Sequence, residues 1–134
     1  IRRPPRSTQG VSSAASDVYK RQKSIDSGSW NIVHTYSGTL EGRLASMLVG
    51  TGAEIALVSR FRDGETRLTA RAPRSSTQQG VHLGNLMAAV AERIGGEGGG
   101  HDGAAGWSGK ADRIAAESAF IAQVAIAART EANT

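Results

Sequence analysis

The chain has 134 residues and no cysteine, which excludes a disulfide framework and a thiolate metal site. Its formal net charge of +4 is carried entirely by residues 1–22, whereas residues 23–134 hold 11 basic and 11 acidic side chains. The basic balance therefore does not indicate a general nucleic-acid-binding surface, and any such binding must use a local site. Since no apolar run approaches the ~20 residues of a membrane span, we expect a soluble cytoplasmic protein without membrane contact.

Residues 1–22 have no hydrophobic period. They are similar to translated sequencing-adapter read-through, and a natural basic tail that binds nucleic acid is the alternative. We therefore predict a non-native or disordered segment at residues 1–22 and one small folded domain at residues 23–134.

Strand and helix patterns alternate along the domain. Strands are predicted from β-branched and alternating runs, and helices from apolar residues three or four positions apart. The predicted elements are a strand at Trp30–Tyr36, a helix at Leu40–Val49 ended by Gly50, a strand at Glu54–Phe61, a hairpin turn at Asp63-Gly64, a strand at Thr66–Ala72, a polar loop at Pro73–Gln79, a helix at Leu83–Ile94 ended by Gly95, a strand at Ala104–Trp107 and a helix capped by Ser108 that buries Ile114, Ile121, Val124, Ala125 and Ala128. This order predicts a single α/β domain with a small mixed β-sheet covered by helices.

The glycine-rich run from Gly95 to Gly106 is the most informative stretch. Such composition is typical of a flexible linker, but the amphipathic segment before it and the apolar Ala104–Trp107 after it favour an ordered loop. Its successive N–H groups could form a nest for a phosphate oxygen, with His101 beside it. There is no Walker A motif, and the G-x-G-x-x-G match at Gly98 lacks the preceding strand and following helix of a dinucleotide site.

The sequence Gly-Gly-Gly-His-Asp-Gly-Ala-Ala-Gly at Gly98–Gly106 resembles the signature of the DHH-associated C-terminal domain of DHH-family phosphoesterases. The segments Gly80–Met87 and Thr69–Arg71 also resemble that family, and the resemblance extends from Ser29 to about Ala128. Glu97 and Asp102 look most like the archaeal RecJ-like single-strand exonuclease branch.

The resemblance implies a substrate-binding role without catalytic residues in this chain. Nucleotide or phosphate contacts are carried over to Gly98, Gly99, Gly100, His101, Ala104, Ala105 and Arg71. Arg71 lies at the end of its strand, and Arg74, directly after Arg71-Ala72-Pro73, is the alternative phosphate-contacting arginine. The implied partners are a single-stranded nucleic acid or nucleotide and a missing N-terminal DHH catalytic domain.

Two other function classes are possible for this sequence. A complete phosphodiesterase needs two divalent ions, Mn or Mg in this family, and the chain has no Asp-His-His triplet or Asp-x-Asp pair to hold them. We expect the metals in the missing domain. The second alternative is an RNA-related module like the C-terminal domain of alanyl-tRNA synthetases, although His101 before Ala-Ala-Gly favours the phosphoesterase branch.

The remaining candidates have structural explanations. Asp102 could orient His101 but is not expected to act as a general base, and His82 is expected to be structural or solvent-facing. His34 is expected on the solvent side of its strand, and Glu41 with Arg43 to form an exposed charge pair. The few aromatic residues show no cluster in the sequence that would predict a stacking platform.

Overall fold

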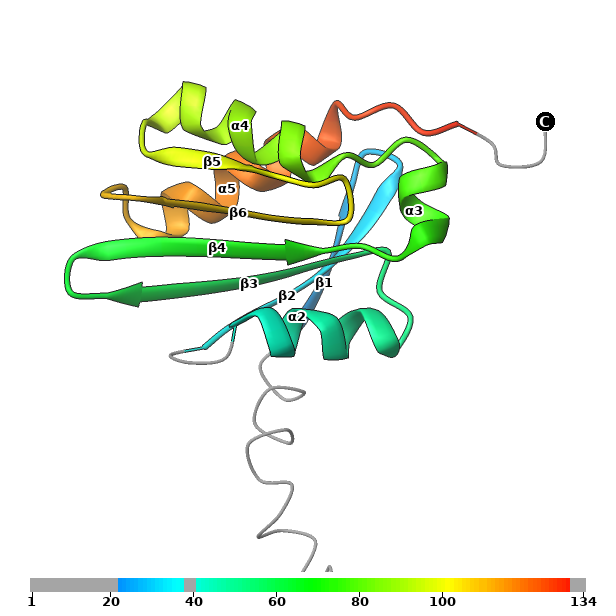
Figure 1. Cartoon of the computed structure of the whole chain (residues 1–134), viewed down its shortest axis with the longest axis horizontal. Helices are drawn as coiled ribbons and strands as arrows, with labels where there is room; N and C mark the ends of the chain where they lie inside the picture. Colours follow the sequence, from blue (N-terminus) through cyan, green and yellow to red (C-terminus); the bar gives the residue numbers. More distant parts are fainter. Residues whose placement is uncertain (1–21, 38–40, 131–134) are drawn as a thin grey trace, which may run out of the picture.

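In the computed structural model, which describes residues 22–37 and 41–130, six strands form one sheet in the order β1-β2-β3-β4-β6-β5 (Figure 1). β2 and β3 are parallel, and the other neighbouring strands are antiparallel. The elements are β1 (Lys23–Ser27), β2 (Trp30–Tyr36), α2 (Glu41–Gly50), β3 (Ile55–Arg62), β4 (Glu65–Arg71), α3 (Arg74–Gln78), α4 (Leu83–Ile94), β5 (Glu97–Gly100), β6 (Ala104–Gly109) and α5 (Arg113–Ala125). This mixed sheet with helices confirms the predicted fold class.

The two faces of the sheet are covered unequally. α4 and α5 lie on one face, over a large core that includes Trp30, Trp107 and Phe120 (Figure 1). α2 lies on the other face, where Leu48 and Val58 belong to a smaller cluster of mostly small residues. α2 packs against β3 and β4 and makes no comparable contact with β6 or β5. One half of the sheet therefore has an open face on the α2 side.

The strongly periodic elements were predicted correctly. Trp30–Tyr36 and Leu83–Ile94 have the predicted bounds, and the β3–β4 hairpin turns at Asp63 and Gly64, both with positive φ. Two regions differ. β1 was not predicted, and the predicted polar loop at Pro73–Gln79 contains the short helix α3, in which the Pro73 carbonyl accepts hydrogen bonds from the Ser76 and Thr77 amides.

The last helix also begins later than predicted. Ser108 lies within β6, and the N-cap is Asp112, whose carboxylate accepts a hydrogen bond of 2.7 Å from the Ala115 amide. The face of the helix that packs on the core also differs from the predicted one. Ile114 is 62% exposed, and the buried residues are Ala116, Glu117, Phe120 and Val124. Residues 1–21 of the predicted N-terminal segment lie outside the part of the chain that the structure describes, and so does the side chain of Glu41.

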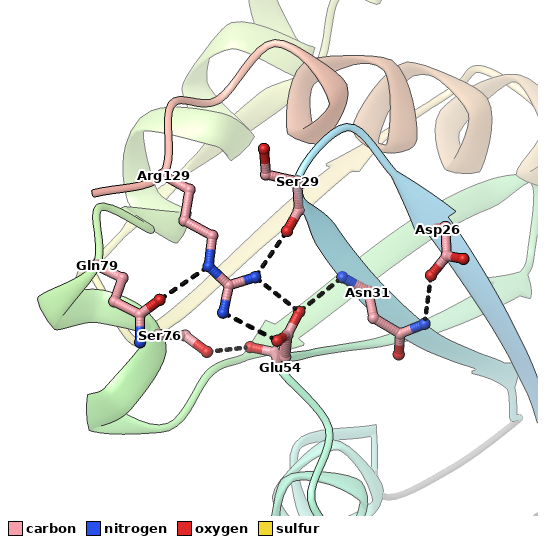
Figure 2. A network of polar contacts seen from close by, with 7 residues as sticks. All are labelled: Asp26, Ser29, Asn31, Glu54, Ser76, Gln79 and Arg129. Carbon is pink, nitrogen blue, oxygen red and sulfur yellow. Dashed lines mark hydrogen bonds and ion pairs between the residues drawn. The ribbon is translucent and has the colours of Figure 1, made fainter. Parts of the chain in front are cut away.

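Arg129 ties the C-terminal segment to three separate elements (Figure 2). Its guanidinium donates to the Glu54 carboxylate at 3.0 Å and to the Ser29 carbonyl at 2.6 Å. It also donates to Gln79 and lies 4.1 Å from the Trp30 ring centroid. Burial alone would raise the pKa of Glu54, but hydrogen bonds from Arg129 and Asn31 hold it below its usual value. This network joins the turn after β1, the start of β3 and the segment after α3.

His34 is buried, contrary to the expected solvent position, and is 8% exposed. α5 covers its face of β2 and brings Glu117 to 3.1 Å from His34 Nε2. Ser59 donates to the same carboxylate oxygen, as does Arg113 at 2.8 Å. One Glu117 oxygen thus receives three polar partners, which is how a buried carboxylate is tolerated in a core.

The pH dependence of stability tests this buried cluster. Burial alone would raise the pKa of Glu117, but His34, Ser59 and Arg113 lower it from 4.5 to about 2. A lowered pKa contributes stability that is present above pH 4.5 and is lost as the pH falls toward 2. We expect the free energy of unfolding to fall by about 3 kcal/mol between about pH 5 and about pH 2, measured by urea denaturation.

Glu117→Gln should remove most of that pH slope while lowering stability at neutral pH, because Arg113 loses its buried partner. Glu92→Gln, at an exposed position of α4, is the matched control and should keep the slope. An unchanged slope in Glu117→Gln would show that Glu117 is not the group that is titrated.

Candidate functional site

A shallow groove of about 700 Å³ lies over β4, β6 and β5. All but one of the predicted site residues line it: Arg71, Gly98, Gly99, Gly100, Ala104 and Ala105. His101 does not line the groove, although it lies between Gly100 and Ala104 in the β5–β6 turn. The sheet pairing therefore gathers residues from two distant parts of the sequence.

The floor of the groove is formed by three strands in register. Thr69 of β4 pairs with Gly106 of β6, which pairs with Gly99 of β5. A Cβ atom on Gly99 would meet nothing within 4 Å, so this glycine faces open space. The floor is consequently almost free of side chains, and a ligand can approach the backbone closely.

Charged residues flank this floor at both ends. Arg67 pairs in register with Ser108, which pairs with Glu97, and all three line one end of the groove. Arg71 lines the other end, and its Nη1 donates to the Ala70 carbonyl at 3.1 Å. Side chains two residues apart on a strand share a face, so Arg67 and Arg71 lie on the same side as Thr69. Both arginines therefore border the bare floor.

Arg74, the alternative to Arg71, begins α3 and is exposed, but it does not line the groove. Arg67, Thr69, Gly106 and Ser108 line it without having been predicted. An alternation of polar residues along Thr66–Arg71 was the available signal, but assigning its face required the strand register.

The glycine run forms an edge strand, not the predicted loop with a nest. The His101 amide donates to the Ala104 carbonyl at 2.8 Å, which makes this a hydrogen-bonded pair of the β5–β6 ladder. Bonded and non-bonded pairs alternate in an antiparallel ladder, so Gly98 and Gly100 occupy non-bonded pairs. Their N–H groups point toward the edge of the sheet, where they remain usable as donors to an anion.

Close packing against α4 explains two of the glycines. A Cβ atom on Gly98 would overlap the Met87 carbonyl, and one on Gly84 would overlap the Gly100 carbonyl. The β5–β6 turn is fixed to the same helix, because the Leu83 and Gly84 amides donate to the Asp102 and His101 carbonyls at 2.8 Å each. The turn thus satisfies amides that the start of a helix leaves free.

The side chains of His101 and Asp102 are exposed at this turn. His82 is exposed as well, and its Nδ1 accepts from the Asn85 amide at 3.1 Å as the N-cap of α4, in agreement with the structural role expected for it. Within residues 22–37 and 41–130 there is no group of three His, Asp or Glu side chains that could hold a metal ion. The described part of the chain therefore does not fit a divalent metal site. None of its helices is long and apolar enough to span a membrane.

Comparison with known proteins identifies the family. A family model of the DHHA1 domain matches residues 31–127, and the chain therefore belongs to this DHH-associated domain family. An uncharacterized protein of Methanocaldococcus jannaschii is 36% identical over 86 residues, which are 63% of this chain and 26% of that protein. The chain thus spans about a quarter of the length of the curated relative that it matches.

Three solved structures share the fold. The C-Ala domain of Aquifex aeolicus alanyl-tRNA synthetase has a TM-score of 0.63 at 15% identity, covering 77% of this chain and 98% of that domain. A DHH-domain protein described as a member of a family of ribosomal proteins has a TM-score of 0.67 at 18% identity, and the match covers 90% of this chain and 31% of that protein. The pGpG-specific phosphodiesterase PggH from Vibrio cholerae has a TM-score of 0.56 at 17% identity, and the match covers 82% of this chain and 37% of that enzyme. At these identities the likeness concerns the fold alone.

Two neighbouring glycines should respond differently to substitution. Gly98→Ala should lower the free energy of unfolding by about 2 kcal/mol or more, and the melting temperature with it, because the new methyl group overlaps α4. Gly99→Ala should change stability by less than about 1 kcal/mol, since its Cβ enters open space. Thermal unfolding followed by circular dichroism measures both. Equal destabilisation of the two variants would contradict the placement of Gly99 on the groove floor.

Proposed function

We propose that this chain is the substrate-binding domain of a metal-dependent DHH-family phosphoesterase, of the RecJ-like exonuclease type, and that its groove binds phosphates of a single-stranded nucleic acid or nucleotide. The observation that carries the proposal is the gathering of Arg71 with Gly98–Gly100 in one groove. The family membership supports the phosphoesterase context.

The chemistry of the groove suits a phosphate diester. An arginine fork donates two parallel hydrogen bonds to phosphate oxygens, and Arg67 and Arg71 provide such forks on one face. The floor at Gly99 and Gly106 lets a phosphate reach the backbone, while the edge N–H groups of Gly98 and Gly100 add donors. Because residues 23–134 carry balanced charge, attraction to nucleic acid would come from this local arrangement.

Catalysis would belong to a separate part of the protein. The curated relative is about four times as long as the matched region, which leaves room for a catalytic domain. The metals, Mn or Mg, would be held by that DHH domain, because the described residues here do not form a metal site. This chain would position the substrate across the cleft, with the exposed His101 at the rim contacting the nucleotide. We expect no hydrolysis by this chain alone.

The second candidate is an RNA-related binding module, favoured by the likeness to nearly the whole of the alanyl-tRNA synthetase C-Ala domain. The two candidates differ in the ligand that they predict. A phosphoesterase domain should bind short single strands and mononucleotides, whereas an RNA module should prefer a folded RNA. Competition between a short oligonucleotide and a structured RNA hairpin distinguishes them.

Arg71→Ala should weaken binding of a labelled short oligodeoxynucleotide by about tenfold or more, because a charge-assisted hydrogen bond to phosphate is lost. Fluorescence anisotropy at several salt concentrations measures the affinity, and the salt slope should decrease by about one. Arg93→Ala, at an exposed position at the end of α4, removes the same charge from a residue that does not line the groove and should have little effect. Equal losses in the two variants would indicate general charge attraction in place of a groove site.

A further inference from the structure

A second concave site lies on the opposite face of the sheet, at the ends of β2 and β3. It has a volume of about 250 Å³ and is lined by Tyr36, Ser37, Ser59, Arg60, Phe61 and Arg113. Ser59 on its floor contacts Glu117 of α5, which lies on the face away from α2. Two aromatic residues that are far apart in the sequence thus meet in one pocket, contrary to the expectation that the aromatics do not cluster.

The aromatic side chains of this pocket are unusually exposed. Tyr36 is 44% exposed and Phe61 is 57% exposed, in a chain with only two of each residue type. Exposed aromatic rings beside cationic side chains form stacking platforms for bases, because every base has a flat π-face. Among the described residues that line the pocket, none is acidic and none is aliphatic. The lining thus suits a flat polar ring better than an apolar peptide side chain.

Arg113 is held in place before any ligand arrives. Its Nη1 donates to Glu117 at 2.8 Å, and its guanidinium lies 4.6 Å from the Tyr36 ring centroid. Glu117 is fixed in turn by Ser59 and His34 within the core. A guanidinium positioned in this way keeps further N–H donors for an anion and loses little conformational freedom on binding.

We propose that this pocket is a second nucleotide site, in which a base stacks on Phe61 beside Tyr36 and the phosphate is bound by Arg113. The site is separate from the groove and does not depend on the function proposed for it. In a longer single strand, the pocket would hold one nucleotide on the far side of the β3–β4 hairpin.

An NMR titration of the full chain with AMP tests the proposal. The ring protons of Phe61 and Tyr36 should shift upfield on binding, and ribose 5-phosphate, which has no base, should bind far more weakly. Phe61→Ala should lower the affinity for AMP by about tenfold, as followed by the ring protons of Tyr36. Ile126→Ala, a substitution at a 77% exposed apolar position outside the pocket, is the control and should bind like the unmodified chain.

The Gly99 amide reports on the groove in the same titration, so the two sites succeed or fail separately. The proposal is wrong if the Phe61 and Tyr36 rings do not move at millimolar AMP, or if Phe61→Ala binds AMP with unchanged affinity. A pocket that responds to an acidic aromatic dipeptide but not to AMP would be a protein contact, and this result would also overturn the proposal.

Discussion

The backbone-to-backbone contact between β5 and α4 is the constraint on which the open groove depends. At Gly98 and Gly84 the strand and the helix approach so closely that a single methyl group would overlap a carbonyl. Hydrogen bonds from the first amides of α4 to the β5–β6 turn fix the same junction. The β5–β6 hairpin is thereby held from one face only. No helix is needed on the other face to hold the hairpin in place, and that face is open.

The three glycines Gly98, Gly99 and Gly100 are consequently required for different physical reasons. Gly98 permits the approach to α4, Gly100 has a positive φ of 142°, and Gly99 faces the open side where nothing is nearby. Only Gly99 lacks a structural requirement among these three. The absence of a side chain there is the feature that ligand binding explains best, because a bare floor brings the backbone within reach of a phosphate.

Two polar networks, one buried around Glu117 and one partly exposed around Arg129, hold the opposite half of the domain. Glu117 lies among Ser59, His34 and Arg113 beneath α5, and Glu54 is bound by Arg129 at the C-terminal segment (Figure 2). Ion pairs of this kind contribute little net stability compared with apolar packing, but breaking one partner is costly. The Glu117 network joins α5 to β2 and β3, and it thereby fixes the position of Arg113 beside Tyr36.

Local patterns predicted much of the fold and less of the site. Trp30–Tyr36 and Leu83–Ile94 were predictable because their periodicity is strong, whereas β5 was not, because glycines carry no pattern of burial. The burial of His34 depends on Glu117 and the rest of α5, far along the chain, and no local signal reports it. Arg71 and the glycines were found through a family resemblance, but Thr69 and Gly106 required the strand register.

The most direct test of the groove is an NMR titration of the chain with a short single-stranded oligonucleotide. If the groove binds phosphate, the amides of Thr69, Gly99 and Gly106 and the Arg71 guanidinium should shift together and saturate with one affinity. Unchanged signals at all of these positions at millimolar oligonucleotide, or saturable shifts elsewhere alone, would contradict the assignment of this face as the binding site.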